Sequence, residues 1–189
     1  MKRSLDRAAV VSICLGILAF ALDRVQKFIQ VSPDCMELGA RNCLDQAQTG
    51  SPFGATGWRG GEYLPVTSFF DYVLVWNKGI SYGLLTAVPV PILGVIMAIA
   101  IVALCVWWTR ATSGLVRSGL ALCIGGAVSN AADRWIYGGV ADFFYFHWQQ
   151  YSFYIFNLAD TAITFGVCLL ILDLLGVGRP KGGVAPKTL

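Results

Sequence analysis

The chain has 189 residues, of which 56% are hydrophobic and only 13% are charged. Soluble domains have about 25% charged residues, so this composition excludes an ordinary soluble domain and indicates a membrane protein. The net charge of +3 includes no basic cluster with interleaved aromatic residues, so nucleic acid is not an expected partner.

An apolar segment near the N-terminus predicts a first membrane span over residues 8–29. The basic residues before it also fit a secretory signal peptide. No small-x-small cleavage site follows, and the rest of the chain is itself membrane-like, so we expect a retained helix. Asp23 and Lys27 are four residues apart near the end of this helix. They therefore lie on one helical face and can pair near the far membrane surface.

The longest polar region, residues 30–80, predicts an extracytoplasmic loop. Residues 63–76 within it are rich in β-branched and aromatic side chains, which suit one or two short strands at the membrane surface. Cys35 and Cys43 also lie in this region, and they can pair if it faces an oxidising compartment. The six cysteines show no CxxC spacing and no histidine lies nearby except His147 far along the chain, so a zinc site is not expected.

Three further apolar segments predict membrane spans over residues 88–108, 118–136 and 153–175, since about 20 residues cross the hydrocarbon. Glycine residues in the third span permit close helix packing. The aromatic segment 137–152 predicts a second extracytoplasmic loop with a short interfacial helix. The last segment, residues 178–189, is expected to be a flexible tail.

These elements predict an all-α membrane protein that forms one domain over residues 1–189. It has four transmembrane helices, a small extracytoplasmic β-containing loop region and the short interfacial helix. Lysine and arginine gather near the N-terminus, in the loop 110–117 and in the tail, so the positive-inside rule predicts that both termini are cytoplasmic. That orientation puts Asp23, Asn77, Asp142 and Asp160 at or just beneath the outer membrane surface.

The chemistry is expected between residues 130 and 160, where ionisable groups interrupt an apolar and aromatic stretch. Such groups are costly near hydrocarbon and usually mark function. The one histidine, His147, is interpreted as an interfacial residue, which argues against a Ser-His-Asp triad. No GxSxG, HExxH or phosphate-binding glycine motif is present. Two carboxylates, Asp142 and Asp160, remain as the candidate pair.

Two carboxylates about 3 Å apart in a poorly solvated site share one proton, because both cannot ionise easily. The ionised member can then activate water as a general base, and the protonated member can donate to a carbonyl oxygen. This is amide hydrolysis without a covalent intermediate. Asp133 is expected to pair with Arg134, close to Asn130, and to orient its helix more than to do chemistry.

The same residues carry a resemblance to a known family. Its motifs are Asp23-Arg24-Val25-Gln26-Lys27, Asn77-Lys78-Gly79, Asn130-Ala131-Ala132-Asp133-Arg134, Gly139-Val140-Ala141-Asp142-Phe143 and Phe156-Asn157-Leu158-Ala159-Asp160. In this order the motifs resemble those of the lipoprotein signal peptidases, also called signal peptidase II. The resemblance implies an aspartic peptidase of the bacterial inner membrane. Such an enzyme removes the signal peptide of prolipoproteins before a diacylglyceryl-modified cysteine.

By the resemblance, Asp142 and Asp160 correspond to the catalytic dyad. The residues that correspond to groups around the site are Asn130, Asp133, Arg134, Asn157, Asp23, Lys27 and Asn77. The implied partners are lipid-modified prolipoproteins and membrane lipids, and the protein is expected to act as a monomer with its active site near the periplasmic face. No cofactor is implied.

Two other functions fit a membrane protein with buried aspartates. A small transporter or channel would use Asp133, Asp142 and Asp160 to bind protons or cations. It would spread ionisable residues through the membrane depth, whereas here they gather at one surface. A structural membrane subunit would use its polar residues to bridge helices.

Overall fold

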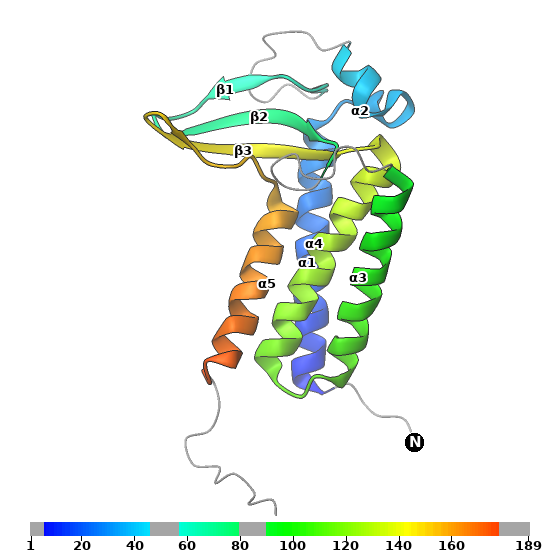
Figure 1. Cartoon of the computed structure of the whole chain (residues 1–189), viewed down its shortest axis with the longest axis vertical. Helices are drawn as coiled ribbons and strands as arrows, with labels where there is room; N and C mark the ends of the chain where they lie inside the picture. Colours follow the sequence, from blue (N-terminus) through cyan, green and yellow to red (C-terminus); the bar gives the residue numbers. More distant parts are fainter. Residues whose placement is uncertain (1–5, 46–56, 80–89, 178–189) are drawn as a thin grey trace, which may run out of the picture.

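The computed structural model describes residues 6–45, 57–79 and 90–177. The predicted tail, residues 178–189, lies outside them. The elements in chain order are α1 (Arg7–Gln30), α2 (Cys35–Asp45), β1 (Tyr63–Pro65), β2 (Phe70–Asn77), α3 (Val90–Arg110), α4 (Gly114–Tyr137), β3 (Val140–Trp148), β4 (Tyr151–Ser152) and α5 (Leu158–Leu174). Helices α1, α3, α4 and α5 run side by side, and the sheet lies across one end of them (Figure 1).

Helix α4 is the centre of the bundle, because it packs against α1, α3 and α5. Glycine makes the closest of these contacts possible. A Cβ atom on Gly125 of α4 would lie 2.3 Å from the carbonyl oxygen of Gly16 in α1, and one on Gly126 would lie 2.4 Å from that of Ala159 in α5. The predicted close packing through the glycines of this helix is confirmed.

Three of the described helices, α1, α3 and α4, are long and apolar enough to cross a membrane. Helix α5 is also apolar, but it has 17 residues. The predicted fourth helix, residues 153–175, is wrong in its first residues, because α5 begins only at Leu158. Asn157 caps α5 in an extended conformation, and its side chain accepts a hydrogen bond from the backbone N–H of Asp160.

The four-stranded antiparallel sheet has the order β1-β2-β3-β4. The strands predicted within residues 63–76 are confirmed as β1 and β2. The loop with a short helix predicted for residues 137–152 is wrong, because these residues contain β3 and β4. Gly138 ends α4 in a left-handed conformation (φ 75°), and the aromatic run that follows pairs with β2, placing Asp142 opposite Val75.

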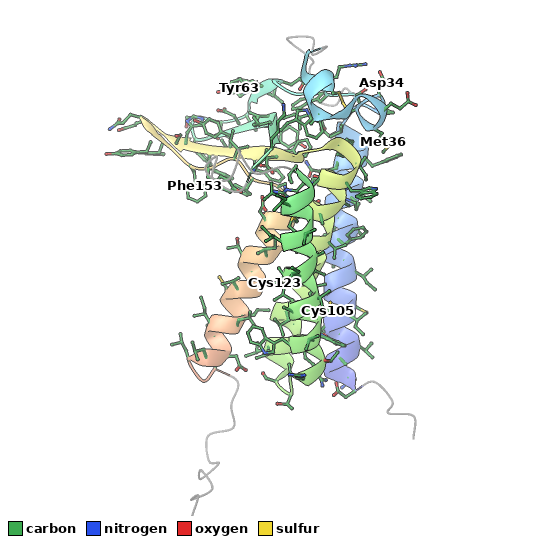
Figure 2. All side chains as sticks on the ribbon, turned by 45° about the vertical axis from the view of Figure 1, so that its right-hand side comes forward. Asp34, Met36, Tyr63, Cys105, Cys123 and Phe153 are labelled. Carbon is green, nitrogen blue, oxygen red and sulfur yellow. A yellow bond between two sulfur atoms is a disulfide. The ribbon has the colours of Figure 1, made fainter. Side chains whose placement is uncertain are left out.

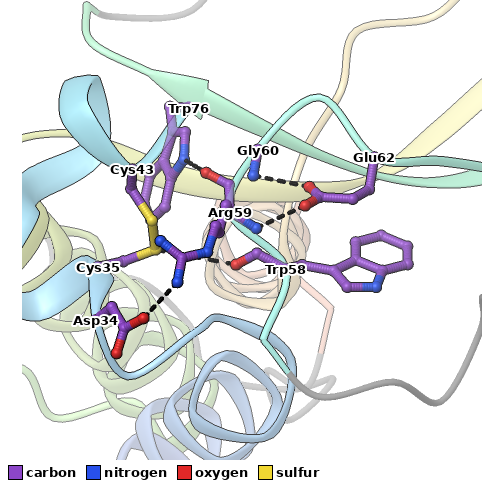
Figure 3. The surroundings of a disulfide bond; sticks show 8 residues. All are labelled: Asp34, Cys35, Cys43, Trp58, Arg59, Gly60, Glu62 and Trp76. Atoms are coloured by element: carbon purple, nitrogen blue, oxygen red, sulfur yellow. Dashed lines mark hydrogen bonds and ion pairs between the residues drawn. A yellow bond between two sulfur atoms is a disulfide. The ribbon is translucent and has the colours of Figure 1, made fainter. Parts of the chain in front are cut away.

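A short surface helix does exist, but it is α2 in the first loop. It is kinked at Gly39, and a disulfide joins its first residue, Cys35, to Cys43 in its last turn, both fully buried (Figure 3). Beside it, Arg59 pairs with Asp34, and the indole of Trp76 donates to the Arg59 carbonyl oxygen at 2.7 Å. Figure 2 shows Asp34 and Met36 at this end of the molecule, and Cys105 and Cys123 on the helices beneath the sheet.

The sheet is joined internally by a polar contact of the one histidine. His147 on β3 lies 2.8 Å from the buried carboxylate of Asp71 on β2, and the hydroxyl of Tyr63 on β1 donates to the same carboxylate at 2.6 Å. The carboxylate of Asp71 thus links β2 to both neighbouring strands, β1 and β3. Along β3, His147 is five residues beyond Asp142, which is roughly 16 Å of extended strand.

Candidate active site

Asp142 and Asp160 come from different elements that the fold brings together. Asp142 is on β3, shortly after the turn that leaves α4, and Asp160 is in the first turn of α5. Two asparagines connect them. The Asn157 amide donates to Asp142 Oδ1 at 2.7 Å and to Asn130 Oδ1 at 3.1 Å. The Asn130 amide in turn donates to Asp160 Oδ1 at 2.8 Å, so one hydrogen-bonded chain links both carboxylates.

The start of α5 fixes the direction of Asp160. Its backbone N–H donates to Asn157 Oδ1 at 2.9 Å, and its Oδ2 accepts from the backbone N–H of Asn157 at 3.3 Å. This reciprocal pair is a capping box, which satisfies two backbone donors at the helix start. The first turn of a helix also favours negative charge, since the backbone N–H groups point toward it.

Asp142 is almost fully buried, with 2% of its surface exposed. Burial raises the pKa of Asp142 from 3.8 to about 8, and the nearby charge of Asp160 acts in the same direction. Hydrogen bonds from Asn77 (3.2 Å to Oδ2) and Asn157 oppose the rise in this pKa. Asp142 therefore holds its proton at neutral pH, as one member of a proton-sharing pair must.

Four charged side chains, Asp23, Arg24, Lys27 and Asp133, form what we call the charge cluster between α1 and α4. Lys27 Nζ lies 2.8 Å from Asp23 and 2.6 Å from Asp133, and Arg24 pairs with both carboxylates. Asp23, Lys27 and Asp133 have at most 1% of their side-chain surface exposed. The predicted pairing of Asp23 with Lys27 is confirmed, whereas the pairing of Asp133 with Arg134 is wrong.

The charge cluster accepts hydrogen bonds from the backbone immediately before each candidate aspartate. Asp23 Oδ1 accepts the backbone N–H of Ala159 at 3.0 Å, and Asp133 Oδ2 accepts that of Ala141 at 3.1 Å. Ala159 precedes Asp160 and Ala141 precedes Asp142. Each carboxylate of the cluster therefore anchors the residue before one candidate aspartate, and Lys27 joins the two anchors.

A cavity of about 220 Å³ opens beside Asp160. The polar residues that line it are Asn77, Asn130, Arg134, Tyr154 and Asp160, and Leu93, Ile96 and Met97 of α3 form part of an apolar wall. The guanidinium of Arg134 donates to the carbonyl oxygens of Asn130 (3.2 Å) and Gly79 (2.9 Å). All nine residues singled out from the sequence thus lie in the cavity wall, in the hydrogen-bonded chain or in the charge cluster.

Two neighbours of the site were not predicted as site residues. Arg24 donates to Ser129 Oγ at 2.7 Å and pairs with Asp133. It could have been suspected, because it lies beside Asp23 in a helix where charge is costly. Tyr154 places its hydroxyl 3.5 Å from Asp160 Oδ2. No sequence pattern indicated it, since it stands among several aromatic residues in an irregular connection.

Fold and site together define a class: a helical membrane protein with a buried aspartate and a half-buried one, joined by hydrogen bonds, beside a partly apolar cavity. Comparison with known proteins then identifies the family. The sequence model of "Signal peptidase (SPase) II" matches residues 15–176. A lipoprotein signal peptidase of Rhodopseudomonas palustris (strain TIE-1) is 50% identical over 125 residues, which are 62% of this chain and 75% of that protein.

Another lipoprotein signal peptidase, of Nitrobacter hamburgensis, is 50% identical over 115 residues, 57% of this chain and 70% of that protein. A solved structure described as a bacterial membrane enzyme shares the fold. Its TM-score is 0.67 at 23% identity, over 93% of this chain and 95% of that one. The chain belongs to the signal peptidase II family and is an aspartic-type peptidase that processes lipoproteins. This assignment favours the peptidase over the transporter and the structural subunit.

Proposed function

We propose that Asp142 and Asp160 are the catalytic dyad of this signal peptidase. The observation that supports the proposal is the single hydrogen-bonded chain, Asp142 to Asn157 to Asn130 to Asp160, beside the cavity. Water attacks directly the peptide bond that precedes the lipid-modified cysteine of the precursor, and that bond is cleaved. The site is shaped by Asn77, Asn130, Asn157 and Arg134. The charge cluster supports it by holding the backbone that precedes each aspartate.

The two aspartates take different roles because their surroundings differ. Asp142 stands on a strand, and burial raises its pKa to about 8, so it serves as the general acid. Asp160 stands at a helix start, where negative charge is favoured, so it serves as the general base. Bringing the two carboxyl groups close together in a poorly solvated site keeps one proton on the pair.

The reaction then proceeds in two balanced steps. Asp160 takes a proton from water as the water oxygen bonds to the scissile carbonyl carbon, and Asp142 gives its proton to the carbonyl oxygen. The resulting gem-diol returns one hydroxyl proton to Asp142 while the carbon–nitrogen bond breaks. Asp160 gives its proton to the departing nitrogen of the cysteine. Both aspartates regain their starting protonation, and no covalent intermediate forms.

The expected topology of the protein belongs to the same proposal. All of residues 1–189 form one membrane domain, with α5 as the fourth span and both termini on the cytoplasmic side of the bacterial inner membrane. Support comes from Arg110 and Arg117, near the ends of α3 and α4 that are remote from the sheet. The sheet and the dyad then lie at the periplasmic face. The protein acts as a monomer surrounded by membrane lipids, and the apolar wall of α3 suits a precursor held in the bilayer.

The test uses the purified full-length protein and a diacylglyceryl-modified precursor. Asp142→Asn and Asp160→Asn should each leave the protein inserted in the membrane but abolish cleavage, because each removes one proton-transfer group. Asp34→Asn is the matched control, since Asp34 is an exposed carboxylate at the same end of the molecule. Normal cleavage by either dyad variant would refute the assignment.

A further inference from the structure

Tyr154 stands in the connection between β4 and α5, and it is one of the residues that line the 220 Å³ cavity. Its hydroxyl lies 3.5 Å from Oδ2 of Asp160, which is longer than the roughly 2.5–3.0 Å of an ordinary O–H···O hydrogen bond. Hydrogen bonds of a catalytic site are often long before substrate binds and shorten in the complex. The position of the hydroxyl is therefore that of a donor to Asp160.

The backbone around Tyr154 is held firmly. The carbonyl oxygen of Phe156 accepts from the N–H of Phe143 at 2.9 Å, and the N–H of Phe156 donates to the carbonyl oxygen of Phe144 at 3.2 Å. The ring of Tyr154 is nearly parallel to that of Phe156, at 22° with centroids 6.5 Å apart. These hydrogen bonds hold the connection against β3, the strand that carries Asp142, and the ring of Tyr154 stacks on that of Phe156.

The two oxygens of Asp160 are used differently. Oδ1 accepts from the amide of Asn130 at 2.8 Å, while Oδ2 accepts from the backbone N–H of Asn157 at 3.3 Å and from Tyr154. Lys27, Asp23 and Arg134 are charged groups that interact electrostatically with Asp142 or Asp160, and Asp160 also acts on Asp142. Tyr154 brings a hydroxyl donor to Asp160 from the cavity wall.

We propose that Tyr154 is a positioning residue of the dyad, whose hydroxyl turns Oδ2 of Asp160 toward the attacking water and whose ring walls the substrate cavity. The inference rests on the proposed function, because it assumes that Asp160 is the base. The hydroxyl and the ring act separately. Loss of the hydroxyl slows turnover, whereas loss of the ring also loosens the fit of the substrate beside the scissile bond.

The experiment measures kcat and KM of the full-length protein on a diacylglyceryl-modified precursor. Tyr154→Phe keeps the ring, so KM should stay unchanged and kcat should fall about fivefold, the effect of one modest hydrogen bond. Tyr154→Ala should lower kcat and raise KM. Tyr151→Phe, the same exchange at a tyrosine that is 70% exposed on β4, is the matched control and should leave both constants unchanged.

The melting temperature of Tyr154→Phe should equal that of the parent protein, which separates positioning from general destabilisation. An unchanged kcat in Tyr154→Phe, or a change confined to KM, would overturn the inference. The dyad would stand in either case, because its own test is the loss of cleavage in Asp160→Asn. Cleavage by Asp160→Asn would instead remove the assignment on which the inference rests.

Discussion

Replacing Lys27 by methionine tests whether the charge cluster supports the dyad. Methionine keeps most of the length of the side chain and removes its charge. The side chain of Lys27 is 1% exposed, and its ammonium contacts Asp23 at 2.8 Å, Asp133 at 2.6 Å and Asn130 Oδ1 at 3.4 Å. Without Lys27, the fully buried carboxylates of Asp23 and Asp133 share Arg24 as their one cation among the described residues.

The magnitude follows from the burial of these partners. Removing one member of a buried ion pair costs about 3–5 kcal/mol, because a charge is left uncompensated away from water. For a protein of this length, that corresponds to a melting temperature lower by roughly 6–20 °C. Turnover should fall as well, because the two carboxylates that Lys27 joins hold Ala141 and Ala159, the residues before the dyad.

Thermal unfolding in detergent and cleavage of a lipidated precursor measure the two effects. Asp34→Asn is the control for stability, since it breaks an exposed ion pair, which is worth about 0–1 kcal/mol. The double variant Lys27→Met/Asp23→Asn removes one charge of each sign and should recover part of the lost stability. A Lys27→Met protein as stable and active as Asp34→Asn would refute the supporting role of the cluster.

Four further predictions concern single features. Cleavage should decline as pH rises past about 8, where Asp142 loses its proton. The free energy of unfolding should fall as pH rises from about 4 to about 8, because over that range the folded state binds the Asp142 proton more tightly than the unfolded state does. Asp133→Asn should lower the free energy of unfolding by about 3 kcal/mol, and an inactive but fully stable variant would argue for catalysis instead. Gly126→Ala should cost about 1–3 kcal/mol in a thermal melt, because its Cβ would lie 2.4 Å from the Ala159 carbonyl oxygen. Gly94→Ala, inside α3, meets nothing within 4 Å and should instead raise stability by about 0.5–1 kcal/mol, the helix preference of alanine over glycine. Reducing the Cys35–Cys43 disulfide should lower stability by about 2 kcal/mol, and an unchanged melting temperature in reductant would contradict this.

The sequence predicted the three described helices that are long and apolar enough to cross a membrane, because apolar length alone is a strong signal. It could not place the start of α5, since Phe153 to Phe156 are as apolar or aromatic as the helix that follows. The same ambiguity concealed β3, because a short apolar and aromatic run suits a strand or a helix equally well. In both cases the decisive signal is a cap: Asn157 before α5, and Gly138 after α4.

The sequence predicted which residues lie at the site better than it predicted which of them contact each other. Asp142 and Asp160 stood out because carboxylates are rare among apolar residues. The prediction that Asp133 pairs with Arg134 was wrong, because consecutive residues in a helix do not face each other. Asp133 and Arg134 consequently point to different sides, one toward Lys27 and the other toward the cavity. The correct partner required knowing that α1 lies beside α4.

The separation of Asp133 from Arg134 explains how one helix can serve both support and chemistry. Asp133 faces α1 and joins a cluster with two carboxylates and two cations, so the cluster adds no formal net charge behind the dyad. Arg134, one residue on, brings a cation to the cavity side, where Asp142 and Asp160 act on it electrostatically. Exchanging the two residues, as Asp133→Arg/Arg134→Asp, keeps the total charge but reverses both environments. We expect that protein to lose its fold and its activity together, and a folded, active exchange variant would show that the direction of these charges is unimportant.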